Sequence, residues 1–155
     1  MTRSSGLSLG KTRLLRLGGR VGRPVDKGGR SLKFHWIAGK FAVCRLAPEA
    51  PVPEWAGGAP FLTITRTGEE VSIVCLDGNI PAGVKAEHGW GCFKLEGPFP
   101  FMETGILASF IGPLAENGIP VFAVSTFDTD YVLVKEEFVA MALAALAQAG
   151  HELVA

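Results

Sequence analysis

Residues that could bind a small molecule gather in two segments, residues 96–105 and residues 125–131. Both segments contain more glycine and polar residues than a loop that merely connects two elements needs. The first leads into a predicted helix, and the unpaired N–H groups at a helix start suit a carboxylate. The second supplies Asp128 and Asp130, whose charge suits an ammonium or guanidinium group. Together they fit a zwitterion such as a free amino acid, although Asp and Thr can also stiffen a turn by bonding to their own backbone.

Catalytic chemistry has less support. Cys92 and His88 could form a nucleophile–base pair, but Cys92 lies in an apolar run where a packed thiol is the simpler interpretation. The histidines His35, His88 and His151 share no metal-ligand spacing. The sequence therefore predicts no enzyme, no metal site and no cofactor. Only a fold that brought His88 or His151 beside Cys92 or a carboxylate in a cleft would favour catalysis.

The first 40 residues differ from the rest in charge. They carry ten Lys or Arg and one Asp. Residues 41–155 carry five Lys or Arg and fourteen Asp or Glu. A basic, glycine-rich leader could bind nucleic acid through its charge, but we favour a solvated tail or a start codon placed too far upstream. We therefore expect residues 1–30 to be disordered. The segment Gly6–Thr12 is not a phosphate-binding loop, because three residues rather than four separate its glycines.

Composition also bears on location. The leader has no apolar stretch typical of a secretory signal, and no run of about 18 uncharged apolar residues predicts a membrane span. Three widely spaced cysteines fit reduced thiols better than a disulfide framework or a zinc site. We expect a cytoplasmic protein with no membrane partner.

The second half of the chain predicts a regular order of elements. They are a strand at 90–96, a helix at 104–117, strands at 120–125 and 131–134, a helix at 136–149 and a short strand at 152–154. Apolar residues recur at helical spacing in both helices, and Pro113 should kink the first. This order is the βαββαβ pattern of ferredoxin-like α+β folds. Two helices would cover one sheet face and leave the other free for a neighbouring sheet.

The first half predicts mostly strands. Apolar runs at 32–37 and 41–46 surround a glycine and suggest a hairpin, and a second hairpin joins 61–65 to 71–76. Between them, prolines stop any strand and allow a single helical turn at 53–56 at most. Residues 81–88 are a weak helix candidate. We divide the chain into a leader (1–30), an abbreviated N-terminal unit (31–88) and a C-terminal unit (89–155).

Several stretches resemble the small bacterial tandem ACT-domain proteins. The resemblance covers about residues 32–153 and is most specific in the run Ser-Thr-Phe-Asp-Thr-Asp-Tyr at 125–131. The other stretches are Phe41–Leu46, Phe61–Thr65, Glu96–Pro98, Thr104–Ser109 and Pro113–Glu116. The wider family includes regulatory domains of aspartate kinases and cytosolic arginine sensors, in which amino acids bind between paired ACT units. Carried over by position, the resemblance implies ligand-binding roles for Thr104, Gly105, Ile106, Thr126, Phe127 and Asp130. Asp128 is added as a candidate because of its charge.

The resemblance implies a regulatory module that senses a free amino acid at the interface between ACT units. The aspartates favour a basic amino acid, although either could instead cap the turn. The chain holds two units at most, and the N-terminal one lacks a convincing first helix, so we expect a homodimer to complete the site. The alternative is a structural module that forms a dimer or contacts a protein partner without any small ligand.

Overall fold

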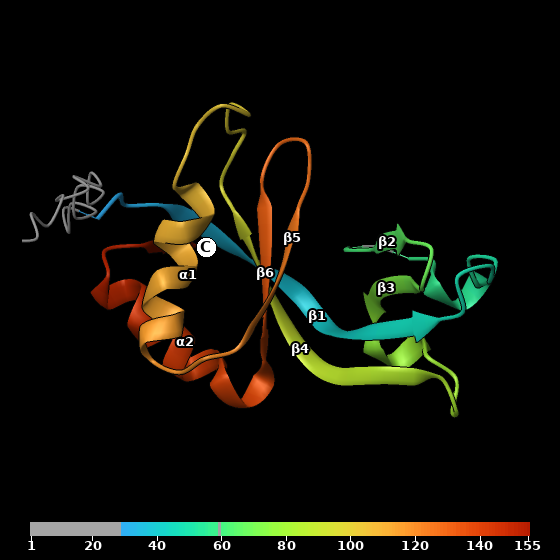
Figure 1. Cartoon of the computed structure of the whole chain (residues 1–155). Coiled ribbons are helices and arrows are strands. Elements are labelled where there is room, and N and C mark those ends of the chain that lie inside the picture. Colours follow the sequence, from blue (N-terminus) through green and yellow to red (C-terminus); the bar gives the residue numbers. More distant parts are fainter. Residues whose placement is uncertain (1–28, 59) are drawn as a thin grey trace, which may run out of the picture.

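The computed structural model describes residues 29–58 and 60–155. The segment Gly6–Thr12 and all but the last two residues of the expected leader lie outside the described residues. Over the described ranges, seven strands form one sheet and two α-helices pack on it (Figure 1). In chain order the elements are β1 (Lys33–Leu46), β2 (Thr63–Arg66), β3 (Val71–Leu76), β4 (Lys85–Leu95), α1 (Ile106–Glu116), β5 (Val121–Ser125), β6 (Asp130–Lys135), α2 (Val139–Gln148) and β7 (Glu152–Val154). No helix within these ranges is long and apolar enough to cross a lipid bilayer.

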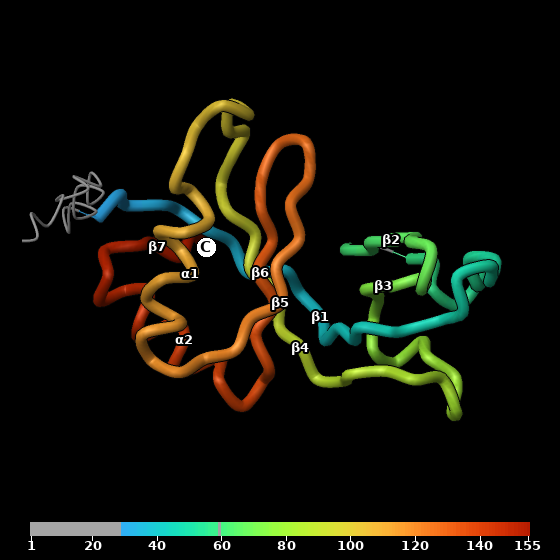
Figure 2. The backbone as a smooth tube through the Cα atoms, viewed as in Figure 1, coloured from blue at the N-terminus to red at the C-terminus, as the bar shows by residue number. Residues whose placement is uncertain are grey.

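Strand β1 is continuous, so the hairpin predicted at 32–46 is wrong. Gly39 has a φ of 118°, which permits a bulge in the strand rather than a turn. The pairing of β1 with β4 shifts register between Ile37 and Phe41, on either side of that glycine. Along this one strand, Phe34 and Phe41 belong to two different hydrophobic clusters. One strand therefore serves both parts of the molecule, as the tube in Figure 2 shows.

The helix predicted at 81–88 is also wrong, because β4 begins at Lys85. Its first residues pair with the far half of β1, with Val43 opposite Glu87 and Arg45 opposite Lys85. Pro81 and Gly83 make the local helix signal weak, and pairing with a long neighbouring strand overrides it. The hairpin of β2 and β3 is confirmed, and so is the single helical turn, which spans Glu54–Ala56.

The sheet has the strand order β2-β3-β1-β4-β6-β5, with β7 beside β1. Helices α1 and α2 lie on one face of the C-terminal part (Figure 1), which confirms the ferredoxin-like α+β class. The last strand differs from that of an isolated βαββαβ unit, where it would pair with the first strand. Here the first half of β1 takes the place beside β4, and β7 pairs with β1 in parallel. The N-terminal strand therefore completes the C-terminal sheet.

Helix α1 continues through Pro113, which lies inside it. A proline has no N–H, so it cannot bond to the carbonyl four residues earlier, at Ser109. That carbonyl instead lies 2.9 Å from Nε2 of His151, a residue that is only 6% exposed. Because Nδ1 of His151 accepts a hydrogen bond from the Leu32 N–H, the neutral ring carries its proton on Nε2 and donates to Ser109. His151 is thus a structural residue.

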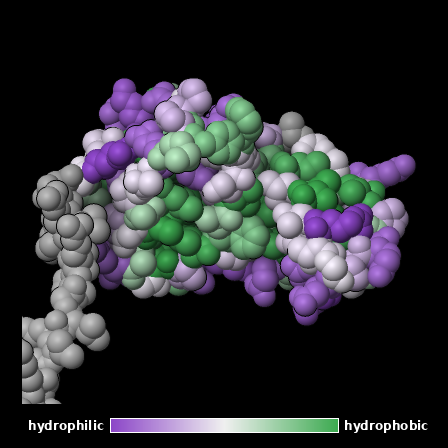
Figure 3. Space-filling model, turned by 45° about the horizontal axis from the view of Figure 1, so that its top comes forward, coloured by the Kyte–Doolittle hydropathy of each residue, from purple (hydrophilic) through white to green (hydrophobic). Residues whose placement is uncertain are grey.

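Hydrophobic side chains form clusters on both sheet faces. The helix side holds the largest one, which includes Phe34, Phe93, Phe110 and Leu146, all at most 1% exposed. The opposite face was expected to be free for a neighbouring sheet, and Phe61 of the N-terminal part packs there. In the view of Figure 3, apolar side chains are also exposed over both parts of the molecule.

Candidate functional site

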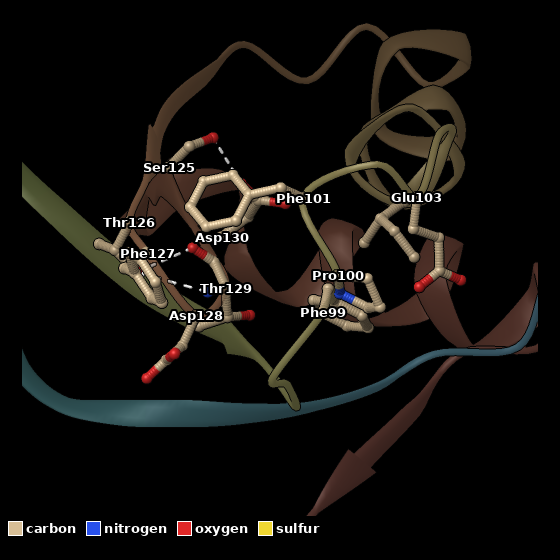
Figure 4. A pocket seen from close by; sticks show the side chains of 11 residues that line it. Phe99, Pro100, Phe101, Glu103, Ser125, Thr126, Phe127, Asp128, Thr129 and Asp130 are labelled. Atoms are coloured by element: carbon tan, nitrogen blue, oxygen red, sulfur yellow. Dashed lines mark hydrogen bonds between the residues drawn. The ribbon is translucent and has the colours of Figure 1, made fainter.

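The two polar segments meet at one end of the sheet, as expected. There they enclose what we call the loop cavity, with a volume of about 210 Å³ (Figure 4). One wall comes from the loop between β4 and α1, and the other from the turn between β5 and β6. The cavity is lined by Phe99, Pro100, Phe101, Glu103, Ile106, Ser125, Thr126, Phe127, Asp128, Thr129 and Asp130.

The turn from β5 to β6 is held by its own hydrogen bonds. The N–H and Oγ1 of Thr126 both donate to the carbonyl of Thr129, at 2.8 and 2.9 Å. Thr129 is 6% exposed, and its hydroxyl donates to the carbonyl of Leu95 at 2.8 Å. Ser125 and Asp130 face each other across the strand pair, where the Ser125 hydroxyl donates to the Asp130 carboxylate at 2.5 Å. The turn is therefore rigid, and Asp130 has a fixed orientation.

The loop before α1 is attached to this turn. The N–H of Phe99 donates to the carbonyl of Asp128 at 2.8 Å. Gly97 allows the close approach, since a Cβ there would lie only 2.7 Å from that same carbonyl oxygen. Farther along, Glu103 forms an ion pair with Arg30. At the helix start Gly105 is left-handed, with φ of +83°, and no side chain caps α1.

Two exposed aromatic rings stand at the loop cavity. Phe101 is 72% exposed and Phe127 is 79% exposed, yet their ring centroids lie 4.9 Å apart in an edge-to-face arrangement. Each ring comes from a different loop, so the pair bridges the two walls (Figure 4). Large apolar side chains this exposed are a common sign of a binding surface.

Most of the residues singled out from the sequence come together here. Ile106, Thr126, Phe127, Asp128 and Asp130 line the loop cavity, whereas Thr104 and Gly105 immediately precede α1 without lining it. The sequence argument did not select the other lining residues, which are Phe99, Pro100, Phe101, Glu103, Ser125 and Thr129. All six belong to the two polar segments. Sequence position could indicate their neighbourhood, but an exposed phenylalanine is not foreseen from its residue type.

The reactive side chains considered for catalysis, Cys92, His88 and His151, do not line the loop cavity. Cys92 is fully buried, and this burial raises the pKa of its thiol to about 12. His88 lies beside a carboxylate, with its Nδ1 2.6 Å from Oδ1 of Asp77. That pair joins Asp77, just after β3, to β4, whereas Cys92 lies four residues farther along β4. Within residues 29–58 and 60–155, no three His, Cys, Asp or Glu side chains gather as metal ligands.

A family model of the ACT domain matches residues 85–148, from the start of β4 to the end of α2. The match includes both loops of the cavity. This chain belongs to the ACT-domain family. A second family model, which describes an N-terminal domain, matches residues 39–83. No curated protein matches the sequence.

Solved structures extend this assignment. Protein Atu0741 of Agrobacterium tumefaciens is 46% identical over 81% of this chain and 93% of its own, with a TM-score of 0.77. The regulatory subunit of aspartate kinase from Thermus flavus is 12% identical over 78% of this ACT protein and 97% of its own chain, with a TM-score of 0.54. E. coli aspartokinase III, solved in complex with aspartate and ADP, is 12% identical over 78% of this chain and 33% of its own, with a TM-score of 0.52.

The regulatory subunit and aspartokinase III share the fold of this ACT protein. At 12% identity, the similarity establishes the fold alone. The Thermus flavus chain is a regulatory subunit, and that property is its own. The sequence-based expectation of an ACT-domain protein related to aspartate kinases is confirmed.

Proposed function

We propose that this protein is a regulatory module that binds a free amino acid in the loop cavity. One observation carries the proposal: the start of α1, the carboxylate of Asp130 and the Phe101–Phe127 pair all meet at a single cavity. A relative of the same fold, E. coli aspartokinase III, was solved with aspartate bound, which supports an amino acid as the ligand class.

The charges of the cavity suggest how the ligand would lie. Its α-carboxylate would accept hydrogen bonds from the uncapped N–H groups at the start of α1, near Thr104, Gly105 and Ile106. Asp130 would hold the ammonium or a cationic side chain, and Phe127 would cover the aliphatic part. The lining has no Lys or Arg but includes Asp128 and Asp130, which favours a basic amino acid, whereas the charge of Glu103 is already met by Arg30.

A thermal-shift panel of the twenty amino acids tests the proposal. A ligand present at 100 times its Kd stabilises the folded state by about 2.7 kcal/mol. We expect at least one amino acid, basic ones first, to raise the unfolding temperature at millimolar concentration. Asp130→Asn should remove that shift. Glu116→Gln, at the exposed far end of α1, should keep it. A panel in which no amino acid stabilises the full chain would refute the proposal.

The alternative function, a dimerisation module without a small ligand, is favoured by strand β5. It stands at the end of the strand order, contains no charged residue, and leaves Ala123 and Ser125 exposed. Unprotected edges of this kind readily pair with another strand. We propose that β5 pairs with its copy in a homodimer. Since Ser125 also lines the loop cavity, the same pairing would bring a second chain to the ligand.

Light scattering on the purified protein distinguishes these possibilities. We expect a dimer that Ala123→Lys converts to a monomer, because a lysine on an edge strand disfavours pairing. A dimer whose stability ignores every amino acid would favour the purely structural function. A wild-type monomer at all concentrations would contradict the dimer proposal and leave the ligand test unaffected.

Two further points remain proposals. We assign the protein to the cytoplasm, because Cys44, Cys75 and Cys92 are free thiols, as a reducing compartment maintains them. We also retain the division into residues 1–30, 31–88 and 89–155, with β1 crossing between the last two as a shared strand.

A further inference from the structure

A second cavity lies on the other side of the turn between β5 and β6. We call it the sheet-face cavity, and its volume is about 290 Å³. It is lined by Lys94, Gly97, Pro98, Thr126, Asp128, Thr129 and Tyr131. Three of these residues, Thr126, Asp128 and Thr129, also line the loop cavity. The rigid turn is therefore a shared wall between two separate spaces.

The sheet places a cation and a hydroxyl in this cavity. Lys94 on β4 lies directly opposite Tyr131 on β6. Their neighbours Phe93 and Val132 are fully buried against the helices. Because side chains alternate along a strand, Lys94 and Tyr131 point to the opposite face. The ring of Tyr131 is held there by stacking on Phe61, with 4.5 Å between centroids.

The turn places an anion in the same cavity. The backbone of Asp128 is fixed by the bond from the Phe99 N–H and by the contact with Gly97. Its side chain points away from the Phe101 and Phe127 rings in Figure 4. Asp128 is thus available to the sheet-face cavity, whereas Asp130 is bonded to Ser125 on the other side.

Lys94 and Asp128 do not neutralise each other. Neither side chain takes part in any ion pair or side-chain hydrogen bond among residues 29–58 and 60–155, and the closest approach of the two charges exceeds the 4.0 Å of an ion pair. Opposite charges that line one cavity without meeting leave a gap that a small molecule carrying both signs can span. The loop cavity differs in this respect, since its lining has carboxylates and no cation.

We propose that the sheet-face cavity is a second binding site, for a small zwitterion of the α-amino acid class. Lys94 Nζ and the Tyr131 hydroxyl hold the carboxylate, and Asp128 holds the ammonium. Charge-assisted hydrogen bonds of this kind are among the stronger polar contacts in proteins. Asp128 lines both cavities, so a ligand on one side of the turn changes the electrostatic field on the other.

Tyr131 provides a direct probe, because it is the only tyrosine in the chain. In the full-length protein labelled with ¹³C-tyrosine, titration with each of the twenty amino acids is followed by NMR. We expect at least one of them to shift the ring signals of Tyr131. Lys94→Gln should weaken that binding by about 10- to 100-fold, the effect of losing one charged hydrogen bond. Lys85→Gln, at the exposed far end of β4, is the matched control and should leave it unchanged.

The outcomes separate the two sites. Ring shifts that persist in Asp130→Asn and disappear in Lys94→Gln support the sheet-face site, whatever the fate of the loop cavity. Thermal stabilisation that requires Asp130 while Tyr131 stays unmoved overturns this inference and leaves the proposed function intact. The N-acetyl derivative of the active amino acid lacks the ammonium and should shift Tyr131 far less. An equal shift from that derivative would overturn the assignment to a zwitterion.

Discussion

The two parts of this molecule share a pair of strands but are covered differently. Strands β1 and β4 run through both parts, yet α1 and α2 cover only the C-terminal one (Figure 1). The C-terminal core therefore includes several large buried rings, whereas the buried members of the separate N-terminal cluster are small, with the partly buried Trp55 packed against them. They are Cys44, Ala56, Val71, Ile73 and Cys75. A small cluster buries little apolar area, so the N-terminal part depends on its contacts with the larger part. We therefore expect the abbreviated unit to gain much of its stability as an extension of the larger part.

The largest effect is expected from the helix-covered core. Phe110 is fully buried, with its ring centroid 5.2 Å from that of Phe34. Phe110→Ala should lower the free energy of unfolding by about 3–5 kcal/mol, because it leaves a cavity between the helices and the sheet. Urea denaturation measures the loss. The control Phe101→Ala removes a ring that is 72% exposed and loses one aromatic pair, so it should cost no more than about 1.5 kcal/mol.

A smaller loss is expected where β4 passes under a tryptophan. A Cβ on Gly91 would lie 2.3 Å from the Trp36 ring and 3.3 Å from Val139. Gly91→Ala should therefore cost about 1–3 kcal/mol through overpacking. Gly112→Ala is the opposite case, since a Cβ there meets nothing within 4 Å inside α1. Gly112→Ala should raise the free energy of unfolding by about 0.4–1 kcal/mol. Thermal melts of both variants check that one is less stable and the other more stable than wild type.

The contact between the two parts can be weakened selectively. Phe61→Leu keeps an apolar side chain but removes the stacking on Tyr131 and the edge contact with Phe41. We expect a loss of about 0.5–1.5 kcal/mol, the value of an aromatic pair. Hydrogen exchange should accelerate in β2 and β3 while α1 and α2 keep their protection. Equal acceleration throughout would show that the two parts unfold as one unit.

The smallest effect depends on pH. Burial alone would raise the pKa of Asp77, but hydrogen bonds from His88 and the Gly89 N–H, with the charges of His88 and Lys40, outweigh it and hold the pKa below its usual 3.8. A carboxyl with a lowered folded-state pKa stabilises the protein above its unfolded-state pKa, and this contribution is lost as the pH falls through the folded-state value. Asp77→Asn should therefore be less stable than wild type at neutral pH.

Urea midpoints of both proteins across the acidic range measure this difference. The gap between Asp77→Asn and wild type should close below pH 3.8. A gap of constant size down to the most acidic conditions would mean that Asp77 acts through packing rather than through its charge.

Local patterns foretold much of the C-terminal half. Both helices and three of the four strands of the second half lie close to their predicted ranges, because apolar spacing and glycine stops are properties of neighbouring residues. Strand β4 ends as predicted but begins earlier, at Lys85. The two polar segments also pointed to the loop cavity. The wrong predictions concern segments whose structure depends on pairing with strands far away in the sequence. Gly39 suggested a turn but permits a bulge, and residues 81–88 lost a weak helical signal to pairing with β1.

The sequence by itself determined the α+β class, the order of the C-terminal elements and the segments that carry the candidate ligand contacts. Only the tertiary structure decided that β1 completes the C-terminal sheet in place of β7, and that His151 bonds to the carbonyl left free by Pro113. It alone placed Lys94, Asp128 and Tyr131 around one cavity and brought together the rings of Phe101 and Phe127 from the two loops. The physical reason is range: periodicity acts over a few residues, whereas register and cavity walls join residues far apart in the chain.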